Sequence, residues 1–396
     1  MFVFLSADIV YVYCNKSSEI VYREFQQALN ETQSLSSRKA GFQRSPPRKT
    51  ANEDMDTMAL SVQMAAHHAQ NLGTIYILVS HAEEVNDERV TSLPNVKVVT
   101  SASLGDGGID VQFSSLKSES SIHRIPNLST LYLAMNDDMI FTRDVDLKSF
   151  FFTPNGSPRA FTGVDPRVES WKHLVQRLIS RKSGSGQLGN MKYTLNRLDS
   201  IAKEVPNKSR ERDGRQQQQH QEQGGGLRLW QSRNKRPKLY PTHAPRPFNK
   251  RFVNLVETLD PDLFQTPFQT RFKCQGCLSP NVLSLLHSAE AGTLRTNQNS
   301  IFSFWNHESY DGDESQLQYT LLAYIDSKRT WNKVVEQWDS ITFLTLQEVE
   351  PEWQSTVRSF IEDEKLRREG NQGEKTTLAS VALNRRESQN RVITSQ

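Results

Sequence analysis

The feature that most constrains this chain is an apolar run that ends in adjacent carboxylates. Residues 131–135 read Leu-Tyr-Leu-Ala-Met, which is the pattern of a short buried strand. The run is followed directly by Asn136, Asp137 and Asp138. Two neighbouring carboxylates at the end of a buried strand are costly unless something compensates their charge. A divalent cation that carries a phosphate group is a common compensation, so we predict a metal site here.

A second group of polar side chains lies just upstream of this run. Glu119, His123 and Arg124 fall within one short stretch of the sequence. Combined with the acidic strand end, they predict metal-assisted chemistry on a phosphorylated substrate. Residues 118–145 are therefore where we expect the functional site.

Alternating strand and helix patterns predict an α/β fold. Strands rich in β-branched and aromatic residues are expected at 9–13, 74–79, 94–100 and 341–346. Residues 54–72 have the apolar spacing of a helix that Gly73 stops. With the strand at 131–135, this predicts an open, Rossmann-like, mostly parallel sheet with flanking helices. Ligands bind at the carboxyl ends of strands in such sheets, where Asn15 and residues 136–138 would lie.

The remaining patterns predict how the chain is organised. We expect further helices at 21–29, 171–179, 195–202, 249–259, 280–287, 317–329 and 331–338, and a strand or loop at 150–163. Residues 6–202 would form the first part of a catalytic domain and 239–362 its second part. A disordered insert at 203–238 would separate the two, and a polar tail would occupy 363–396.

The insert also holds the basic charge of the protein. The net charge is +3, but residues 208–238 contain nine basic and three acidic residues and so carry +6 by themselves. The rest of the chain is therefore slightly acidic, which argues against a general nucleic-acid surface. An RNA- or membrane-binding arm is the rival interpretation. Because Trp230 is the single aromatic residue available there for stacking, we favour a solvated Gln/Gly-rich insertion.

Cysteine usage and hydropathy limit the other function classes. Cys14, Cys274 and Cys277 do not make a disulfide framework, and the Cys-x-x-Cys pair lacks a second pair to complete a zinc site. Plain thiols or a local disulfide are the expected state. No apolar run reaches the length of a membrane span. Asp8 interrupts the apolar run at 1–14, which therefore predicts a first strand rather than a signal peptide.

These motifs resemble those of the Stealth proteins, a family of sugar-1-phosphate transferases. The most specific match is Glu-Ser-Ser-Ile-His-Arg-Ile at 119–125, followed by Leu128-Ser129 and by residues 136–138. Weaker matches to the other family motifs occur at 8–15, at 52–62, at 243–247 (His-Ala-Pro-Arg-Pro), at 271–273 (Arg-Phe-Lys) and at 343–348. The resemblance covers roughly residues 6–350.

The resemblance implies transfer of a sugar-1-phosphate, such as GlcNAc-1-phosphate from UDP-GlcNAc, to a hydroxyl of a glycan or glycoprotein. It implies Mg²⁺ or Mn²⁺ held by Asp137 and Asp138, with Asn136 orienting the group. It implies catalytic roles for His243, His123, Glu119 and Asp138, and substrate binding by Asn15, Asn52, Arg124, Asn136 and Arg271. No nucleic-acid partner is expected, and a homo-oligomer is compatible with the family. A Golgi or other secretory-pathway location is implied for a eukaryotic source and a cytoplasmic one for a bacterial source.

Several positions depart from the family pattern, and they keep other activities open. Ser121 and Arg246 stand where the family has histidines, Asp56 replaces a basic residue, and Gln347 replaces an acid. The first alternative is a nucleotide-sugar glycosyltransferase, in which an acidic strand end also holds the metal. The second is a catalytically inactive Stealth-like protein that binds its ligand without turnover.

Overall fold

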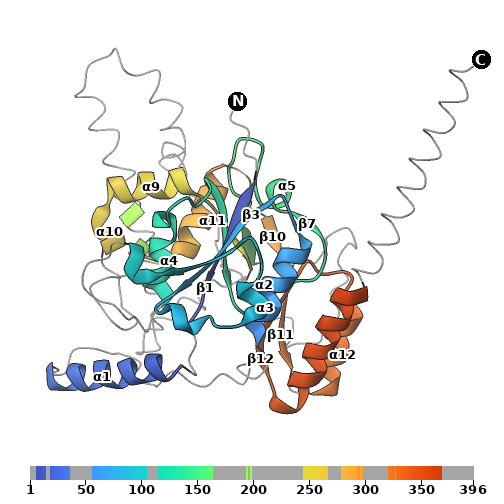
Figure 1. Cartoon of the computed structure of the whole chain (residues 1–396). Helices are drawn as coiled ribbons and strands as arrows, with labels where there is room; N and C mark the ends of the chain where they lie inside the picture. The colour runs from blue at the N-terminus through green and yellow to red at the C-terminus, as the bar shows by residue number, and fades with distance from the viewer. Residues whose placement is uncertain are drawn as a thin grey trace, which may run out of the picture.

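A central five-stranded sheet organises the molecule (Figure 1). The computed structural model describes residues 6–14, 18–35, 56–104, 115–163, 193–194, 197–198, 244–265, 278–291, 293, 295–297, 320–325 and 327–367. The strand order is β4 (Val96–Thr100), β3 (Leu72–Val79), β1 (Ala7–Val12), β5 (Leu131–Asn136) and β9 (Arg246–Asn249). The first four strands run parallel and β9 runs antiparallel to β5. The predicted mostly parallel α/β sheet is confirmed.

The order of the strands creates a switch point. From β1 the chain moves outward to β3 and β4, and it then returns to place β5 on the other side of β1. The connections on the two sides of β1 therefore lead away from each other, and open α/β sheets bind their ligands outside the carboxyl ends of the strands at such a point. Asn136 is the last residue of β5, so the acidic triplet lies at this point.

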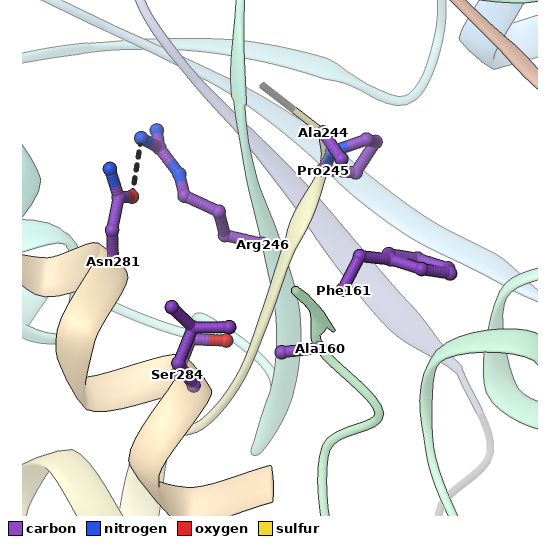
Figure 2. A pocket seen from close by; sticks show the side chains of 8 residues that line it. Ala160, Phe161, Ala244, Pro245, Arg246, Asn281 and Ser284 are labelled. Carbon is purple, nitrogen blue, oxygen red and sulfur yellow. Dashed lines mark hydrogen bonds between the residues drawn. The ribbon is translucent and has the colours of Figure 1, made fainter. Parts of the chain in front are cut away.

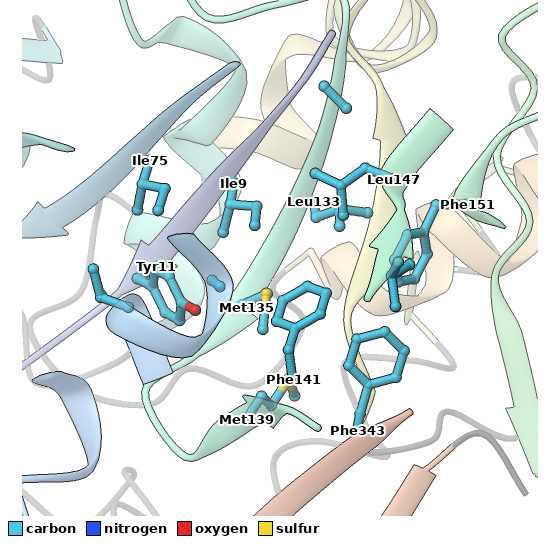
Figure 3. Close-up of a cluster of buried hydrophobic side chains, with 14 of the residues drawn as sticks. Ile9, Tyr11, Ile75, Leu133, Met135, Met139, Phe141, Leu147, Phe151 and Phe343 are labelled. Atoms are coloured by element: carbon cyan, nitrogen blue, oxygen red, sulfur yellow. The ribbon is translucent and has the colours of Figure 1, made fainter. Parts of the chain in front are cut away.

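Each face of the sheet carries its own layer of helices, because successive strand side chains point to opposite sides. One face packs Ile9, Tyr11 and Leu133 against α2 (Thr57–His68) and the aromatic residues that follow β5 (Figure 3). The other face packs Val10 and Tyr132 against α9 (Lys250–Leu259), α10 (Pro261–Gln265) and α11 (Pro280–Glu290). Each large side chain buried this way contributes about 1.5–3 kcal/mol.

A second, three-stranded sheet extends the molecule beyond α2. It contains β11 (Thr320–Ile325), β12 (Phe343–Val349) and β6 (Met139–Phe141), with β11 parallel and β6 antiparallel to β12. α12 (Lys328–Gln337) and the helix at 351–367 cover it, and their buried side chains form a third cluster with Leu60 and Met64 of α2. β6 follows the acidic turn immediately, so this sheet is attached directly to the site.

The remaining elements are short, apart from one longer helix. They are α1 (Glu19–Leu35), β2 (Ala69–Gln70), η2 (Ala82–Glu84), α3 (Glu88–Thr91), η3 (Ser101–Leu104), α4 (Ser115–Ser121), η4 (Ile122–Arg124), β7 (Val145–Asp146), α5 (Leu147–Phe151), β8 (Phe161–Gly163) and β10 (Arg295–Asn297). In the part of the chain that the structure describes, no helix has the length and apolarity that crossing a bilayer requires.

Four expectations about these elements need correction. Residues 320–325 form β11 rather than a helix, because pairing with β12 suits their β-branched and aromatic side chains. α2 ends at His68, and residues 69–70 pair with β7 well before Gly73. Residues 150–151, at the start of the strand or loop expected at 150–163, belong to α5, and the helix at 351–367 extends into the residues expected as a polar tail. The expected helix at 171–179 and the insert lie outside the described residues.

Candidate functional site

The candidate site is built around the turn that follows β5. Asp137 and Asp138 form a two-residue turn between β5 and β6, and both side chains are half-buried. The backbone carbonyl of Asp138 accepts a hydrogen bond of 2.9 Å from the amide of Leu346 on β12. The turn is thus fixed by a strand from the distant end of the chain.

A buried hydroxyl pair supports the turn from the α2 side. The Ser61 hydroxyl on α2 donates to the carbonyl of Met139, the residue after Asp138, and lies 2.9 Å from the Tyr11 hydroxyl. Tyr11 in turn donates to the carbonyl of Ser61 at 3.1 Å. Burial raises the pKa of Tyr11 above its ordinary value, and the nearby charge of Asp137 raises it further. Tyr11 therefore stays a neutral hydroxyl beneath an acidic turn.

Arg246 supports the same turn from the α11 side. This residue begins β9, directly beside the end of β5, and its Nη2 donates to Oδ1 of Asn136 at 3.1 Å. Its Nη1 donates to Oδ1 of Asn281 on α11 at 2.8 Å and lies 3.4 Å from Oε2 of Glu119 on α4. One guanidinium thus joins β5, β9, α4 and α11. Of the residues predicted from sequence, Glu119 and Asn136 are brought together by it.

A small pocket opens beside Arg246 (Figure 2). Its accessible volume is about 10 Å³, which is room for roughly one water molecule. Apolar side chains supply most of its wall, and Arg246, Asn281 and Ser284 supply its polar part. The pocket is therefore continuous with the residues that hold the end of β5.

His123 and Arg124 are paired with Glu257 on α9. Nε2 of His123 lies 2.7 Å from one carboxylate oxygen of Glu257, and the Arg124 guanidinium lies 2.5 Å from the other. His123 is almost fully buried, with its ring edge against Phe264 at a centroid distance of 5.3 Å. The catalytic role predicted for His123 and the substrate-binding role predicted for Arg124 stay predictions, and both would have to come from side chains already engaged by a carboxylate.

The Glu257 cluster predicts a specific dependence of stability on pH. Burial raises the pKa of Glu257, but hydrogen bonds from His123 and Arg124 outweigh it and lower that pKa to about 2. Because the folded-state pKa lies below the unfolded one, this carboxylate stabilises the fold above about pH 4.5 and loses that effect as pH falls towards 2. We expect Glu257→Gln to be less stable than wild type at neutral pH, with the difference narrowing below pH 4.5. Urea unfolding at several pH values measures this, and a difference that stays constant with pH would contradict it.

Four of the predicted site residues lie outside the described part of the chain. They are Asn15, Asn52, His243 and Arg271. Their roles stay predictions, as do those of Cys274 and Cys277. Ala244, the neighbour of His243, is buried and lines the pocket at Arg246.

The carboxylates of Asp137 and Asp138 suit a hard cation that is also coordinated by the phosphates of a substrate. Among the described residues no group of three or more His, Cys, Asp or Glu side chains could hold a metal by itself. Asp137 and Asp138 offer two carboxylates, and Mg²⁺ in nucleotide sites is commonly held by one or two carboxylates plus substrate phosphates and water. The residues present therefore fit such a site once a phosphorylated substrate completes it.

Comparison with known proteins places the chain near several glycosyltransferase structures without establishing a family. No protein-family model and no curated protein matches it. Similar solved structures include galactosyltransferase LgtC with donor and acceptor sugar analogs (7% identity, 90% of this chain and 95% of that chain, TM-score 0.37). They also include the bifunctional glycosyltransferase WbbM (11% identity, 87% of this chain and 46% of that chain, TM-score 0.37). A third is mouse xyloside xylosyltransferase 1 (10% identity, 86% of this chain and 98% of that chain, TM-score 0.33). At these values the Stealth resemblance is not shown.

Sequence reasoning missed the importance of Arg246. It treated this residue as a departure from a histidine position, whereas the structure makes it the link between four elements. Its partner Asn136 lies 110 residues away in sequence. The one local indication was the position of Arg246 in a motif that the resemblance already assigned to the site.

Proposed function

We propose that this protein is a nucleotide-sugar-dependent glycosyltransferase. The observation that carries the proposal is the position of the turn at Asp137 and Asp138, at the carboxyl edge where the strand order reverses between β1 and β5. Open α/β sheets bind nucleotides in the crevice at this point. Carboxylates at the same place supply the ligands that a diphosphate-bound cation needs. The donor would therefore lie across the ends of β1 and β5.

Asp137 and Asp138 would hold Mg²⁺ or Mn²⁺, which supplies charge compensation for the phosphates of the donor and of the leaving nucleotide. The chain itself contributes preorganisation. Hydrogen bonds from Ser61 to Met139 and from Arg246 to Asn136 hold the residues on either side of the carboxylates. Such fixed groups need no rearrangement when charge develops on the leaving group.

Glycosyl transfer is favoured over sugar-1-phosphate transfer by the pairing of Arg124. Glycosyl transfer breaks the bond between the sugar carbon and oxygen, so both phosphates leave together on the nucleotide. Attack at phosphorus instead develops charge on the transferred phosphoryl group, which calls for additional cations close by. Of the two arginines predicted to bind substrate, Arg124 is bound to Glu257, and Arg271 lies outside the described residues. The donor nucleotide, the sugar and the glycan acceptor are open to experiment.

The leaving group tests this proposal. The protein is incubated with Mn²⁺ and a panel of UDP-, GDP- and CMP-sugars, with and without mixed glycan acceptors, and nucleotide products are separated by chromatography. Release of a nucleoside diphosphate from a UDP- or GDP-sugar is the expected result. Release of a monophosphate from such a donor would restore the sugar-1-phosphate transferase. Binding of a nucleotide sugar without any product would instead identify an inactive binding protein.

Cys14 provides an independent test of where the donor binds. This exposed cysteine lies just beyond the carboxyl end of β1, on the edge proposed for the nucleotide. We expect a bound nucleotide sugar with Mn²⁺ to slow alkylation of Cys14 at least about fivefold, since a ligand that covers a thiol blocks access to it. Mass spectrometry of the peptide that contains Cys14 measures the rate. The Asp138→Ala variant should lose the protection, and protection that persists in it would argue against binding at this edge.

A further inference from the structure

The guanidinium of Arg246 fixes the orientation of two side-chain amides near the acidic turn. An amide presents an oxygen acceptor on one side and two N–H donors on the other, whereas a guanidinium can only donate. Nη2 of Arg246 lies 3.1 Å from the Asn136 amide. Nη1 lies 2.8 Å from the Asn281 amide (Figure 2). In both amides the atom that faces Arg246 must therefore be the oxygen, and the amide nitrogen is turned away from it.

Arg246 is itself held in one position. Its Nη1 lies 3.4 Å from the carboxylate of Glu119, and the two side chains are only 11% and 9% exposed, so water screens their attraction poorly. Strong binding of a phosphate or carboxylate by arginine uses two parallel N–H groups. Because both terminal nitrogens of Arg246 already have protein acceptors, the residue suits the positioning of a neighbour better than the binding of an anion.

The amide nitrogen of Asn136 is directed towards the edge proposed for the nucleotide sugar. Asn136 is the last residue of β5, and β5 lies between β1 and β9. Arg246 approaches from β9, so the amide nitrogen lies on the side of β1, where Val12 is the residue in register with Asn136. The Asn136 side chain is half-buried, so part of it stays accessible to a ligand at the carboxyl ends of these strands.

This orientation limits the role that Asn136 can have. A ligand to a hard cation would have to offer its amide oxygen. That oxygen already accepts from a guanidinium, whose positive charge would repel a cation bound beside it. The two N–H donors instead suit an acceptor oxygen of a ligand. The cation proposed at Asp137 and Asp138, the next two residues, would bring the oxygens of a nucleotide sugar to this place.

From these observations we propose that Asn136 donates a hydrogen bond to an oxygen of the nucleotide sugar, and that Arg246 is the positioning residue that turns the Asn136 amide for this contact. The inference rests on the proposed glycosyltransferase function and specifies one contact of its donor site. It also assigns Glu119 to holding Arg246, in place of the catalytic role that the family resemblance implies.

Substitution of Asn136 tests the direction of this hydrogen bond. Isothermal titration calorimetry measures binding of the UDP-, GDP- and CMP-sugars to the full-length protein with Mn²⁺. Asn136→Leu removes the donors without adding charge and should weaken binding at least about fivefold, the loss expected for one hydrogen bond to a charged or polar ligand. Asn254→Leu, the same change at an exposed position of α9, should bind like wild type. Titration of the matching free nucleotide shows whether the contacted oxygen belongs to a phosphate or to the sugar.

Asn136→Asp separates the proposed donor role from a metal-ligand role. The carboxylate would keep an acceptor for Arg246 but would present an oxygen instead of N–H donors to the nucleotide sugar. We therefore expect Asn136→Asp to weaken binding at least as much as Asn136→Leu. Because a carboxylate is a better ligand for a hard cation than an amide oxygen, tighter binding in Asn136→Asp would identify Asn136 as a metal ligand and overturn the inference.

A double-mutant cycle tests whether Arg246 acts through Asn136. Arg246→Met alone would leave the buried charge of Glu119 uncompensated, so it is combined with Glu119→Gln. This charge-free variant should weaken nucleotide-sugar binding about as much as Asn136→Leu does, and in the Asn136→Leu background it should cost less than about twofold more, because coupled residues lose a shared interaction only once. Equal losses in both backgrounds would mean a merely structural role and would refute the positioning by Arg246.

Urea unfolding checks that each variant still folds cooperatively. If the charge-free variant does not fold, Arg246→Lys takes its place in the cycle with the same expected coupling, since lysine keeps the charge but lacks the fork that bridges two amides. Wild type that binds a nucleotide sugar, with Asn136→Leu binding it equally well, would refute the role of Asn136 alone. Wild type that binds none of the nucleotide sugars would refute the proposed function and this inference with it.

Discussion

Asp138→Ala should reduce turnover of the nucleotide sugar by at least about 10³-fold while leaving the fold intact. Loss of a ligand to the diphosphate-bound cation removes several kcal/mol of charge stabilisation in the transition state, and each 1.36 kcal/mol is about tenfold in rate. The Asp138 side chain is half-buried in a turn, whereas its backbone carbonyl makes the contact with Leu346. Replacing the side chain therefore preserves that contact. Initial rates of nucleotide release, with Mn²⁺ varied, measure the effect.

Asp339→Ala is the matched control for this substitution. Asp339 is 81% exposed and follows α12, on the covering layer of the second sheet. Its loss should change the rate less than about twofold, in line with the small effect of surface substitutions. Undiminished turnover in Asp138→Ala would show that the acidic turn does not hold the cation. It would also contradict the proposed binding of the nucleotide sugar at the ends of β1 and β5.

Asp8→Ala should destabilise the protein by about 3 kcal/mol, because two half-buried backbone N–H groups would lose a charged acceptor at about 1–3 kcal/mol each. The carboxylate is only 2% exposed, and its two oxygens accept from Thr74 at 2.8 Å and from Ser129 at 2.6 Å. It thereby ties the starts of β3 and β5 to β1. Asp8 begins a motif of the family resemblance, yet these contacts make it structural.

Urea unfolding measures the effect of Asp8→Ala, with the exposed Asp363→Ala as control. Gly73→Ala tests the same site from the opposite side, since a Cβ at Gly73 would collide with Oδ1 of Asp8. Both variants should unfold at lower urea than wild type. If Asp8→Ala unfolds at the same urea concentration as the control, the hydrogen bonds of Asp8 with Thr74 and Ser129 contribute no stability, and Asp8 does not hold β3 and β5 to β1.

The central strands of the sheet could be predicted because β1 and β5 are buried along almost their whole length and therefore read as continuous apolar runs. β1, β3, β4 and β5 were all expected close to their observed bounds. β9 was not expected as a strand, since Pro247 has no N–H for a ladder. The structure resolves this by placing β9 at the edge of the sheet, where one side of the strand needs no partner.

The contacts within the site were far harder to predict. The acidic turn could be predicted because its residues are consecutive in the sequence and directly follow an apolar run. Arg246 contacts Asn136, and His123 contacts Glu257, across more than 100 residues of sequence, and charge alone does not tell which carboxylate a cation will pair with. Glu257, which pairs with both His123 and Arg124, carries no local pattern that distinguishes it from other helix carboxylates.

The edge position of β9 has a consequence for biosynthesis. At typical translation speeds of about 5–20 residues per second, the 110 residues that separate Asn136 from Arg246 take roughly 5–20 s to emerge from the ribosome. During that interval the nascent polypeptide presents β5 as a bare apolar ribbon, which is a template for intermolecular pairing. Expression of this protein should therefore depend on holdase chaperones until β9 arrives.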